Sequence, residues 1–572
     1  MKWREAGAEF EAGQFRLRAR LLVAMLGLFA IALLGRALQL QVLDQQFLAE
    51  QGDMRYARVA KMPAHRGSVL DRFGEPLAVS SPVDTVWVNP PELAQATDDI
   101  PRLARALHRD PQWLAQRVTS NLDRQFLYVA RHMDPAEAAK IKALDIPGVY
   151  LLREYRRYFP NGEVTGHLLG FTNLDEAGQE GLELEYDQSL AGMDGAKRVI
   201  QDGRGRVIQN VESIRAPRPG EDLYTSIDLR IQYLAYRELK SAISRYRARA
   251  GSIIVIDVTT GEVLAMVNQP SFNPNDREQY EVGRYRNRAA TDIYEPGSSI
   301  KPFVIAAALA SGRYQPGSMI DTSAFKVGPR TFEEQHNLGV IDIGEVLSRS
   351  SNVAMAKIAL SLEPEQMHDT LSSFGFGDVT ASGFPGESAG LLSGTAHWRP
   401  INIATMAFGY GLSVTPIQLA QGYATIGALG LHRPITFRRV QEPPPATRVL
   451  DEKVTRDLIG LLEGVVSPGG TGAKAAVPGY RVAGKTGTAW KAVPGGYSKD
   501  RYLSVFAGVV PASHPRLATV VMIDEPSGVL YYGGDVAAPV FSAVMSGALR
   551  LMSVAPDDLE RVAPALVAGN AQ

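Results

Sequence analysis

The stretch EPGSSIKPFVIAAAL, residues 295–309, decides how the fold of this chain is interpreted. A Pro-Gly turn leads into an apolar, alanine-rich run, which predicts a buried helix. Ser298 opens this run, and Lys301 follows one helical turn later on the same face. Because a serine hydroxyl is a weak nucleophile until a base takes its proton, the spacing predicts a nucleophilic serine beside a lysine. Lysine can act as that base only where its pKa is lowered, by burial or by a second cation.

A second string, Ser-Ser-Asn at residues 350–352, supplies polar groups suited to the same site. We expect the Ser350 hydroxyl to relay a proton toward a leaving or attacking amine. We expect the Asn352 amide to orient Lys301 and the backbone of a substrate.

A third string, Lys-Thr-Gly-Thr at residues 485–488, follows YRVAG at 480–484, and the segment predicts a strand. The hydroxyls and the Lys485 ammonium suit a substrate carboxylate, and Lys485 is the second cation that would lower the pKa of Lys301. Gly487 would let another backbone approach closely. The predicted substrate-binding residues are Lys485, Thr486, Gly487 and Thr488.

The edge of that strand also predicts an oxyanion hole. A strand edge beside the start of a helix can aim two backbone N–H groups at a developing negative charge, and we assign these groups to Ser298 and Thr488. The predicted catalytic residues are Ser298, Lys301, Ser350 and Asn352.

Local context separates these strings from decoys elsewhere in the chain. SAFK at 323–326 also reads S-x-x-K, but VGP follows it, and no helix would continue through that run. SFN at 271–273 also reads S-x-N, but it precedes the nucleophile and is flanked by prolines. K-T-G occurs once.

In this order, the three strings resemble the signature of penicillin-binding proteins and class A β-lactamases. The wider chain resembles a class B penicillin-binding protein, and most of all the division-specific peptidoglycan D,D-transpeptidase of Gram-negative bacteria. The resemblance covers most of the chain. Its C-terminal landmarks are IVID at 254–257, TGEVLAM at 260–266, NRA at 287–289, FGYGL at 408–412, TPIQLA at 415–420, GGTG at 469–472, YYGG at 531–534 and APVF at 538–541.

The N-terminal half carries further landmarks, which we interpret as structural. Their glycines mark turns, and we expect their charged residues to pair between a non-catalytic pedestal and the catalytic domain. They are RG at 66–67 with DRFG at 71–74, RYFP at 157–160, GHLLG at 166–170 and GLE at 181–183.

The resemblance implies an α+β fold with a transmembrane helix, an elongated mixed α/β pedestal and a penicillin-binding, serine β-lactamase-like transpeptidase domain. That last domain would hold an antiparallel sheet flanked by helices, together with a helical subdomain. The expected division is a cytoplasmic tail at 1–20, an anchor at 21–43, the pedestal at 44–220, the transpeptidase domain at 221–555 and a flexible tail at 556–572.

The expected reaction is cross-linking of septal peptidoglycan stem peptides through a serine acyl-enzyme, with β-lactams as inhibitors. A hydrolase such as a D,D-carboxypeptidase or β-lactamase is an alternative, although no E-x-x-L-N run lies between Asn352 and Lys485. A β-lactam sensor or scaffold and an elongation-type transpeptidase are further alternatives. Tyr410, Tyr502 and Tyr532 are candidate cleft-lining residues.

The run from Leu21 to Leu40 is long enough to span a membrane, with Arg36 near its end. Five basic residues precede it, so the N-terminus is expected in the cytoplasm and the catalytic domain in the periplasm, on a single-pass inner-membrane anchor. A cleaved signal peptide is the alternative, with a small-residue site at 30–32. The resemblance implies that a polytopic glycosyltransferase and other division proteins are partners.

The composition of the chain argues against several other functional classes of protein. The formal net charge is −1, which argues against a nucleic-acid binder. There are no cysteines, so thiolate catalysis and disulfides are excluded, and none of the nine histidines forms an H-E-x-x-H pair. We expect no metal and no cofactor. The expected substrates are lipid-linked and polymerised peptidoglycan stem peptides.

Overall fold

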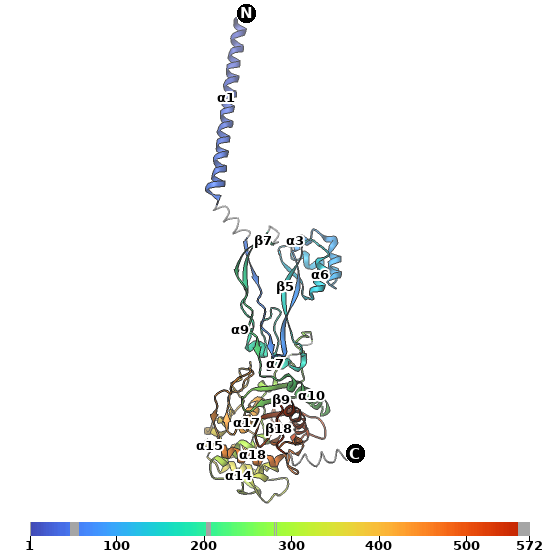
Figure 1. Ribbon diagram of the computed structural model, residues 1–572, viewed down its shortest axis with the longest axis vertical. Helices are drawn as coiled ribbons and strands as arrows, with labels where there is room; N and C mark the ends of the chain where they lie inside the picture. The colour runs from blue at the N-terminus through green and yellow to red at the C-terminus, as the bar shows by residue number, and fades with distance from the viewer. Residues whose placement is uncertain (1, 46–56, 202–206, 279–280, 282, 559–572) are drawn as a thin grey trace. The chain divides into compact units, whose positions relative to one another are not determined.

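The computed structural model describes residues 2–45, 57–201, 207–278, 281 and 283–558 (Figure 1). The chain forms two compact units, each assembled from separate stretches. The range 44–220 contributes to both units, and the boundaries expected from the sequence stay a prediction. From residue 559 onward, the expected C-terminal tail lies outside the described residues. Unit 1 is Met1–Ala64, Val83–Glu154 and Met193–Arg218, and unit 2 is His65–Pro82, Tyr155–Gly192 and Pro219–Gln572.

The N-terminal helix α1 (Lys2–Leu38) continues into a π-helical turn, η1 (Gln39–Leu43). The predominantly apolar part of this helix, Leu17–Leu43, is long enough to cross a membrane and is exposed along its whole length. Exposed leucine, isoleucine and phenylalanine side chains along a whole helix are unfavourable in water, so this feature agrees with a single-pass anchor.

The remainder of unit 1 contains a three-stranded sheet, in the order β1-β6-β7, and a small helical layer over other strands. Asp110 and Asp134 cap their helices by accepting hydrogen bonds from backbone N–H groups, and a proline follows each cap. The elements are β1 (Ala57–Met62), β6 (Gly195–Gln201), β7 (Val207–Arg215), β4 (Leu127–Met133), the adjoining parts of β3 (Pro76–Val88) and β5 (Val149–Tyr158), α3 (Pro90–Leu93), η2 (Thr97–Asp99), α4 (Ile100–Ala106), α5 (Pro111–Thr119) and α6 (Pro135–Lys142).

Unit 2 is built on a five-stranded antiparallel sheet. Both faces of the sheet are covered, which explains the nearly continuous apolar sequence of its inner strands. Ile253 and Val255 belong to one core, and Ile254 and Ile256 to the other, as the alternation of side chains along a strand requires. The strand order is β10 (Val263–Gln269), β9 (Ala250–Asp257), β19 (Leu517–Asp524), β18 (Gly496–Val510) and β17 (Ala483–Val493).

Two groups of helices cover these faces. The helices α10 (Leu229–Arg245) and α20 (Ala538–Leu551) share a core with one face, whereas α17 (Pro416–Gly427) and α12 (Lys301–Ala310) share a core with the other. Helix α18 (Glu452–Val466) packs against β17. The outermost strand β17 therefore has a helix-covered face and one free edge.

A helical subdomain lies beside α12 and completes the α+β fold, which confirms the predicted fold class. Its helices are α13 (Ile343–Ser348), α14 (Asn352–Leu360), α15 (Pro364–Ser373), η5 (Thr395–His397) and α16 (Pro400–Met406). Its short strands are β11 (Met319–Asp321), β12 (Phe325–Val327), β13 (Arg330–Phe332) and β14 (Val340–Asp342). The remaining elements of unit 2 are β2 (Val69–Leu70), η3 (Gly162–Val164), α7 (Gly166–Leu169), α8 (Gly181–Glu185), α9 (Asp187–Leu190), β8 (Leu223–Tyr224), α11 (Arg288–Thr291), η4 (Gly297–Ile300), β15 (Leu431–His432), β16 (Thr447–Arg448), η6 (Ala473–Ala475) and α19 (Gly533–Val536).

The N-terminal landmarks form a buried charged cluster within unit 2. The Arg66 and Arg157 guanidinium groups both donate to the fully buried Glu183 carboxylate, at 2.8 and 2.6 Å, and Arg66 also pairs with Asp187 at 2.7 Å. These arginines therefore pair within the range 44–220, and the expectation that they pair with the catalytic domain is wrong. The expectation is confirmed for Arg72, which pairs with Glu262 at 3.2 Å.

Candidate active site

The nucleophile segment begins with the 3₁₀ turn η4, which continues directly into α12. The Lys301 N–H donates to the Ser298 carbonyl, a tighter turn than the α-helix expected from the sequence. Gly297 precedes the serine with φ of +55°, a left-handed conformation that favours glycine. Ser298 is half-buried in a cleft, and its hydroxyl forms no hydrogen bond to the residues described here.

The Lys301 side chain is fully buried and points to the start of α14. Its Nζ donates to the Ser350 carbonyl at 2.6 Å and to Asn352 Oδ1 at 2.8 Å. Longer bonds reach Ser350 Oγ at 3.1 Å and the Ser351 carbonyl at 3.2 Å. The structure thus brings the first two strings of the sequence together around one amine.

The pKa of Lys301 lies well below its usual value, chiefly because burial removes the ammonium from water and also because the Lys485 charge repels it. Glu334 acts in the opposite direction and raises the Lys301 pKa. Burial lowers the pKa of Lys485 to about 7. Both amines therefore lose a proton far more readily than an exposed lysine.

The third string meets the other two at the Ser350 hydroxyl. Lys485 is fully buried on β17, and its Nζ donates to Ser350 Oγ at 3.1 Å. Since Lys301 Nζ donates to the same oxygen, Ser350 lies between the two amines and its own proton remains available for donation into the cleft. A hydroxyl in this position can pass a proton between an amine in the cleft and Lys301 or Lys485.

The threonine hydroxyls of the K-T-G string are oriented by their neighbours. Thr486 Oγ1 donates to Thr471 Oγ1 at 3.1 Å, and Thr488 Oγ1 accepts from the Gly533 N–H at 2.9 Å. The second bond uses an acceptor site of Thr488 and leaves its proton free to meet an anionic group. Thr471 and Gly533 belong to the GGTG and YYGG landmarks.

The free edge of β17 presents backbone N–H groups toward the nucleophile. The Trp490 N–H points away from β18 and donates to Tyr410 Oη at 3.4 Å. Since alternate residues of a strand point in the same direction, the Thr488 N–H faces the same open edge. The nucleophile turn lies alongside, because an added Cβ on Gly297 would be 3.3 Å from the Thr488 carbonyl oxygen. This geometry fits two N–H groups, of Ser298 and Thr488, that converge on one point.

Two glycines make this close packing possible. A Cβ on Gly487 would lie 2.9 Å from the Pro296 carbonyl oxygen, and a Cβ on Gly409 would lie 2.1 Å from the Gly297 carbonyl oxygen. Both contacts are with the backbone of the nucleophile turn, which cannot move without displacing Ser298. The FGYGL and K-T-G strings thus clamp the turn from two sides.

Comparison with known proteins identifies the family. The penicillin-binding protein transpeptidase domain model matches residues 251–546, and the penicillin-binding protein dimerisation domain model matches residues 61–225. The peptidoglycan D,D-transpeptidase FtsI of Escherichia coli K12 is 42% identical over 563 residues, which cover 98% of this chain and 95% of that one. The chain belongs to the FtsI-type peptidoglycan D,D-transpeptidases.

Two further proteins agree with this assignment, one by sequence and one by structure. The probable peptidoglycan D,D-transpeptidase PbpC of Pseudomonas aeruginosa is 40% identical and covers 94% of this chain and 96% of its own. A crystal structure of a peptidoglycan synthetase from Bifidobacterium adolescentis superposes with a TM-score of 0.71 at 25% identity, and covers 88% of this chain and 98% of its own.

The cleft of this transpeptidase has two hollows that meet beside the nucleophile. A hollow of about 660 Å³ is lined by Ser298, Ser350, Asn352, Thr486 and Thr488, together with charged side chains. A second hollow of about 440 Å³ has an aromatic lining and shares Asn352 and Thr488 with the first. The three tyrosines expected at the cleft, Tyr410, Tyr502 and Tyr532, all line the second hollow, and Tyr532 also lines the first.

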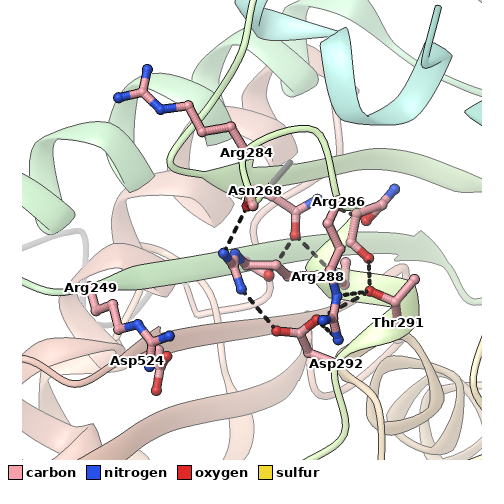
Figure 2. A network of polar contacts seen from close by, with 12 residues as sticks. Arg249, Asn268, Arg284, Arg286, Arg288, Thr291, Asp292 and Asp524 are labelled. Atoms are coloured by element: carbon pink, nitrogen blue, oxygen red, sulfur yellow. Dashed lines mark hydrogen bonds and ion pairs between the residues drawn. The ribbon is translucent and has the colours of Figure 1, made fainter. Parts of the chain in front are cut away.

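The segment before the nucleophile is tied to the central sheet by a polar network (Figure 2). Asn268 on β10 donates to Asn287 Oδ1 at 2.8 Å and accepts from the Ala289 N–H at 2.9 Å. Arg286 and Arg288 both pair with Asp292, at 2.6 and 3.1 Å, as Figure 2 shows. The NRA landmark therefore fixes the chain that leads into the nucleophile turn.

Several residues of the site carry no signal in the sequence, or only a weak one. Glu334 and Phe332 follow no recognisable string, whereas Thr471 and Tyr531 lie inside landmarks whose purpose the sequence does not reveal. Within the described part of the chain, no group of three or more His, Cys, Asp or Glu side chains could hold a metal ion. The charged residues of the larger hollow that the sequence did not single out are Glu333, Glu334, His336, Arg349, Lys474 and Asp535.

Proposed function

We propose that this transpeptidase cross-links septal peptidoglycan through an ester on Ser298. Ser298 Oγ attacks the carbonyl carbon of the D-Ala–D-Ala bond in a donor stem peptide, the C–N bond breaks, and D-alanine leaves with a proton on its amine. An amine of a neighbouring stem peptide then attacks the ester, forms the new amide, and returns the proton to the serine. Two half-reactions that share one ester give ping-pong kinetics.

The position of Ser350 between Lys301 and Lys485 is the observation that carries this proposal. Lys301, whose lowered pKa lets it lose its own proton more readily, accepts the Ser298 proton. Ser350 receives hydrogen bonds from both amines and relays the proton to the leaving D-alanine, then takes one from the attacking amine. Asn352 holds Lys301 and donates its amide to the donor backbone.

The K-T-G strand binds and activates the donor. Lys485 and the Thr488 hydroxyl bind the terminal carboxylate, Thr486 contributes through the Thr471 hydroxyl to which it donates, and the N–H groups of Ser298 and Thr488 stabilise the oxyanion. A β-lactam has the same carboxylate and carbonyl, so it is expected to acylate Ser298 as the donor does. The aromatic hollow formed by Tyr410, Tyr502 and Tyr532 accommodates the side group of the donor or inhibitor.

Labelling with a fluorescent penicillin tests the nucleophile. The full-length protein in detergent micelles is expected to form a stable adduct, and intact-mass and peptide spectra are expected to place it on Ser298. Ser298→Ala is expected to abolish the label, and Ser323→Ala, in the rejected S-x-x-K decoy, is expected to retain it. Persistent labelling of Ser298→Ala would refute the assignment.

The second substrate is tested by product analysis. With stem peptides and an acceptor amine, the expected product is a cross-linked dimer, and the penicillin adduct is expected to persist for many minutes. Rapid release of hydrolysed penicillin would instead indicate a β-lactamase, and release of D-alanine without cross-linking would indicate a carboxypeptidase.

We further propose that the helix Leu17–Leu43 anchors the protein in the inner membrane, with the catalytic unit in the periplasm. The basic N-terminus and the absence of buried residues in this helix support an anchor. The resemblance to division-specific transpeptidases supports a septal role beside a polytopic glycosyltransferase. A tagged copy is expected at midcell at full length; a side-wall pattern would favour elongation, and loss of the N-terminal 32 residues would reveal a signal peptide.

A further inference from the structure

Glu334 lies in the connection between β13 and β14 and contacts the start of α14 directly. Its Oε1 accepts a hydrogen bond from the Val353 N–H at 3.0 Å and a second from the Ser351 hydroxyl. The first N–H groups of a helix have no partner within it, so the carboxylate caps the helix from outside. No string in the sequence singles out this residue.

The Ser351 hydroxyl is fixed in both of its roles. It donates to Glu334 and accepts from the Ala354 N–H at 3.0 Å. The next residue toward the N-terminus, Ser350, has φ of +59°, an unfavourable backbone conformation for a residue with a Cβ. Such a conformation persists only where its surroundings hold it, and the Glu334–Ser351 contact is one of those restraints.

The restrained residues carry the acceptors of Lys301. Its Nζ donates to oxygen atoms of Ser350, Ser351 and Asn352, which are the residues that form the start of α14. If Glu334 did not hold this start, the oxygen atoms would no longer converge on the amine. Glu334 acts on Lys301 through them and need not touch the substrate.

Glu334 also supplies the negative charge that acts on Lys301. The charged groups that act on Lys301 are Lys485 from β17 and Glu334 from the β13–β14 connection, while α14 contributes the neutral groups of Ser350, Ser351 and Asn352. The buried Lys301 amine therefore experiences one repelling charge, Lys485, and one attracting charge, Glu334. The carboxylate raises the pKa of Lys301, against burial and Lys485, which lower it.

We propose that Glu334 is a positioning residue of the acylation reaction, which holds the start of α14 around Lys301 and sets the pH range over which that lysine can accept the serine proton. This inference rests on the proposed role of Lys301 as the base. Glu334 makes a geometric contribution, through its hydrogen bonds at the start of α14, and an electrostatic one, through its charge. Different substitutions remove each contribution.

The test measures the second-order rate constant of acylation by a fluorescent penicillin, from pH 5 to 10, on the full-length protein in micelles. Glu334→Gln retains an Oε1 that can accept both hydrogen bonds but has no charge. In the plot of acylation rate constant against pH, the plateau of this variant is expected within about threefold of wild type. The rising part of the plot is expected to move about one pH unit lower. Glu334→Ala is expected to lose about tenfold or more in the plateau rate, because the helix cap is gone.

The comparison of variants keeps the inference falsifiable. Rescue of the plateau by Gln but not by Ala supports the geometric contribution, and thermal melting shows whether each variant is folded. The inference would be overturned if the rising part of the pH–rate curve did not move in Glu334→Gln. It would also be overturned if Glu334→Ala reached the wild-type plateau rate. Glu363→Gln removes an exposed charge outside both hollows, so an equal shift there would also overturn the inference. Labelling of Ser298→Ala would instead refute the proposed function.

Discussion

Unit 2 contains two clusters of buried basic side chains, and they differ in whether the basic groups pair with carboxylates. In the cluster of Arg66, Arg157 and Glu183, each guanidinium meets a carboxylate at 2.6–2.8 Å. In the active site, Lys301 and Lys485 converge on one neutral hydroxyl, and neither forms an ion pair with a carboxylate among the described residues. The two clusters are equally hidden from water, so burial alone does not distinguish them.

The difference shows how a fold separates stability from reactivity. A buried cation with a partner stays charged, and removing the partner is costly because the charge is left unpaired. A buried cation without a direct partner relieves its cost by losing a proton, which creates a base at neutral pH. The arginine cluster is therefore expected to hold the fold, and the lysine cluster to perform the chemistry.

Replacing Lys301 by Met is expected to separate catalysis from stability most strongly. The acylation rate is expected to fall by about 10³-fold or more, since the base is removed. The free energy of unfolding is expected to fall by only about 1–3 kcal/mol, because no charge is left unpaired although buried oxygen atoms at the start of α14 lose their donor. Penicillin acylation and urea unfolding measure the two quantities. A destabilised variant that still acylates at the wild-type rate would break the comparison.

Replacing Glu183 by Gln is expected to give the opposite result. Both buried arginines lose the Glu183 carboxylate, and Arg66 keeps its pair with Asp187, so the free energy of unfolding is expected to fall by about 3–5 kcal/mol. The folded fraction is expected to acylate normally, which active-site titration with penicillin would show. Glu185→Gln, on the exposed side of the same helix, is the matched control and is expected to change stability by at most about 0.5 kcal/mol.

Adding a methyl group at Gly487 tests the clamp on the nucleophile turn. The new Cβ would lie 2.9 Å from the Pro296 carbonyl oxygen and 3.3 Å from Ser299 Cβ, so the turn must shift. A displacement of this size is expected to lower acylation by about 10²-fold. Gly460→Ala, at a site with no atom within 4 Å, is the control. Equal rates for both variants would show that the close approach is unimportant.

Removing the Thr471 hydroxyl tests how the K-T-G strand binds a substrate carboxylate. Thr471→Val removes the Thr471 hydroxyl, which accepts from Thr486 and keeps its own proton for a group in the larger hollow, so a loss of about 1 kcal/mol, or about fivefold, is expected in binding a substrate carboxylate. The effect is expected in the affinity for penicillin rather than in the acylation rate of the bound complex. A stopped-flow titration separates the two, and an effect confined to the acylation rate would contradict this role.

The catalytic cluster was predictable because its residues lie in short strings with local meaning. Ser298 and Lys301 are one turn apart, and the context of a Pro-Gly turn and an apolar helix distinguishes them from the decoy at 323–326. Gly487 was expected to allow a close approach, and the structure identifies its neighbour as the Pro296 carbonyl. The α+β class followed from the same landmarks.

Contacts between residues far apart in the chain were not predictable. Arg66 reaches Glu183, more than a hundred residues away, and a sequence gives no register for such a pair. Glu334 caps a helix that begins after two further elements, β14 and α13, so no cap signature connects them. The positive φ of Ser350 is likewise imposed by tertiary contacts, because serine has no intrinsic preference for that conformation.

The pH dependence of penicillin acylation by the wild-type protein tests the central claim most directly. The ascending limb, from loss of the Lys301 proton, is expected well below the usual lysine range, and a descending limb is expected from about pH 7 upward as Lys485 loses the charge that binds the carboxylate. Lys485→Arg, which stays charged, is expected to remove the descending limb. A rate that rises only near pH 10, as an ordinary lysine would require, would contradict the account.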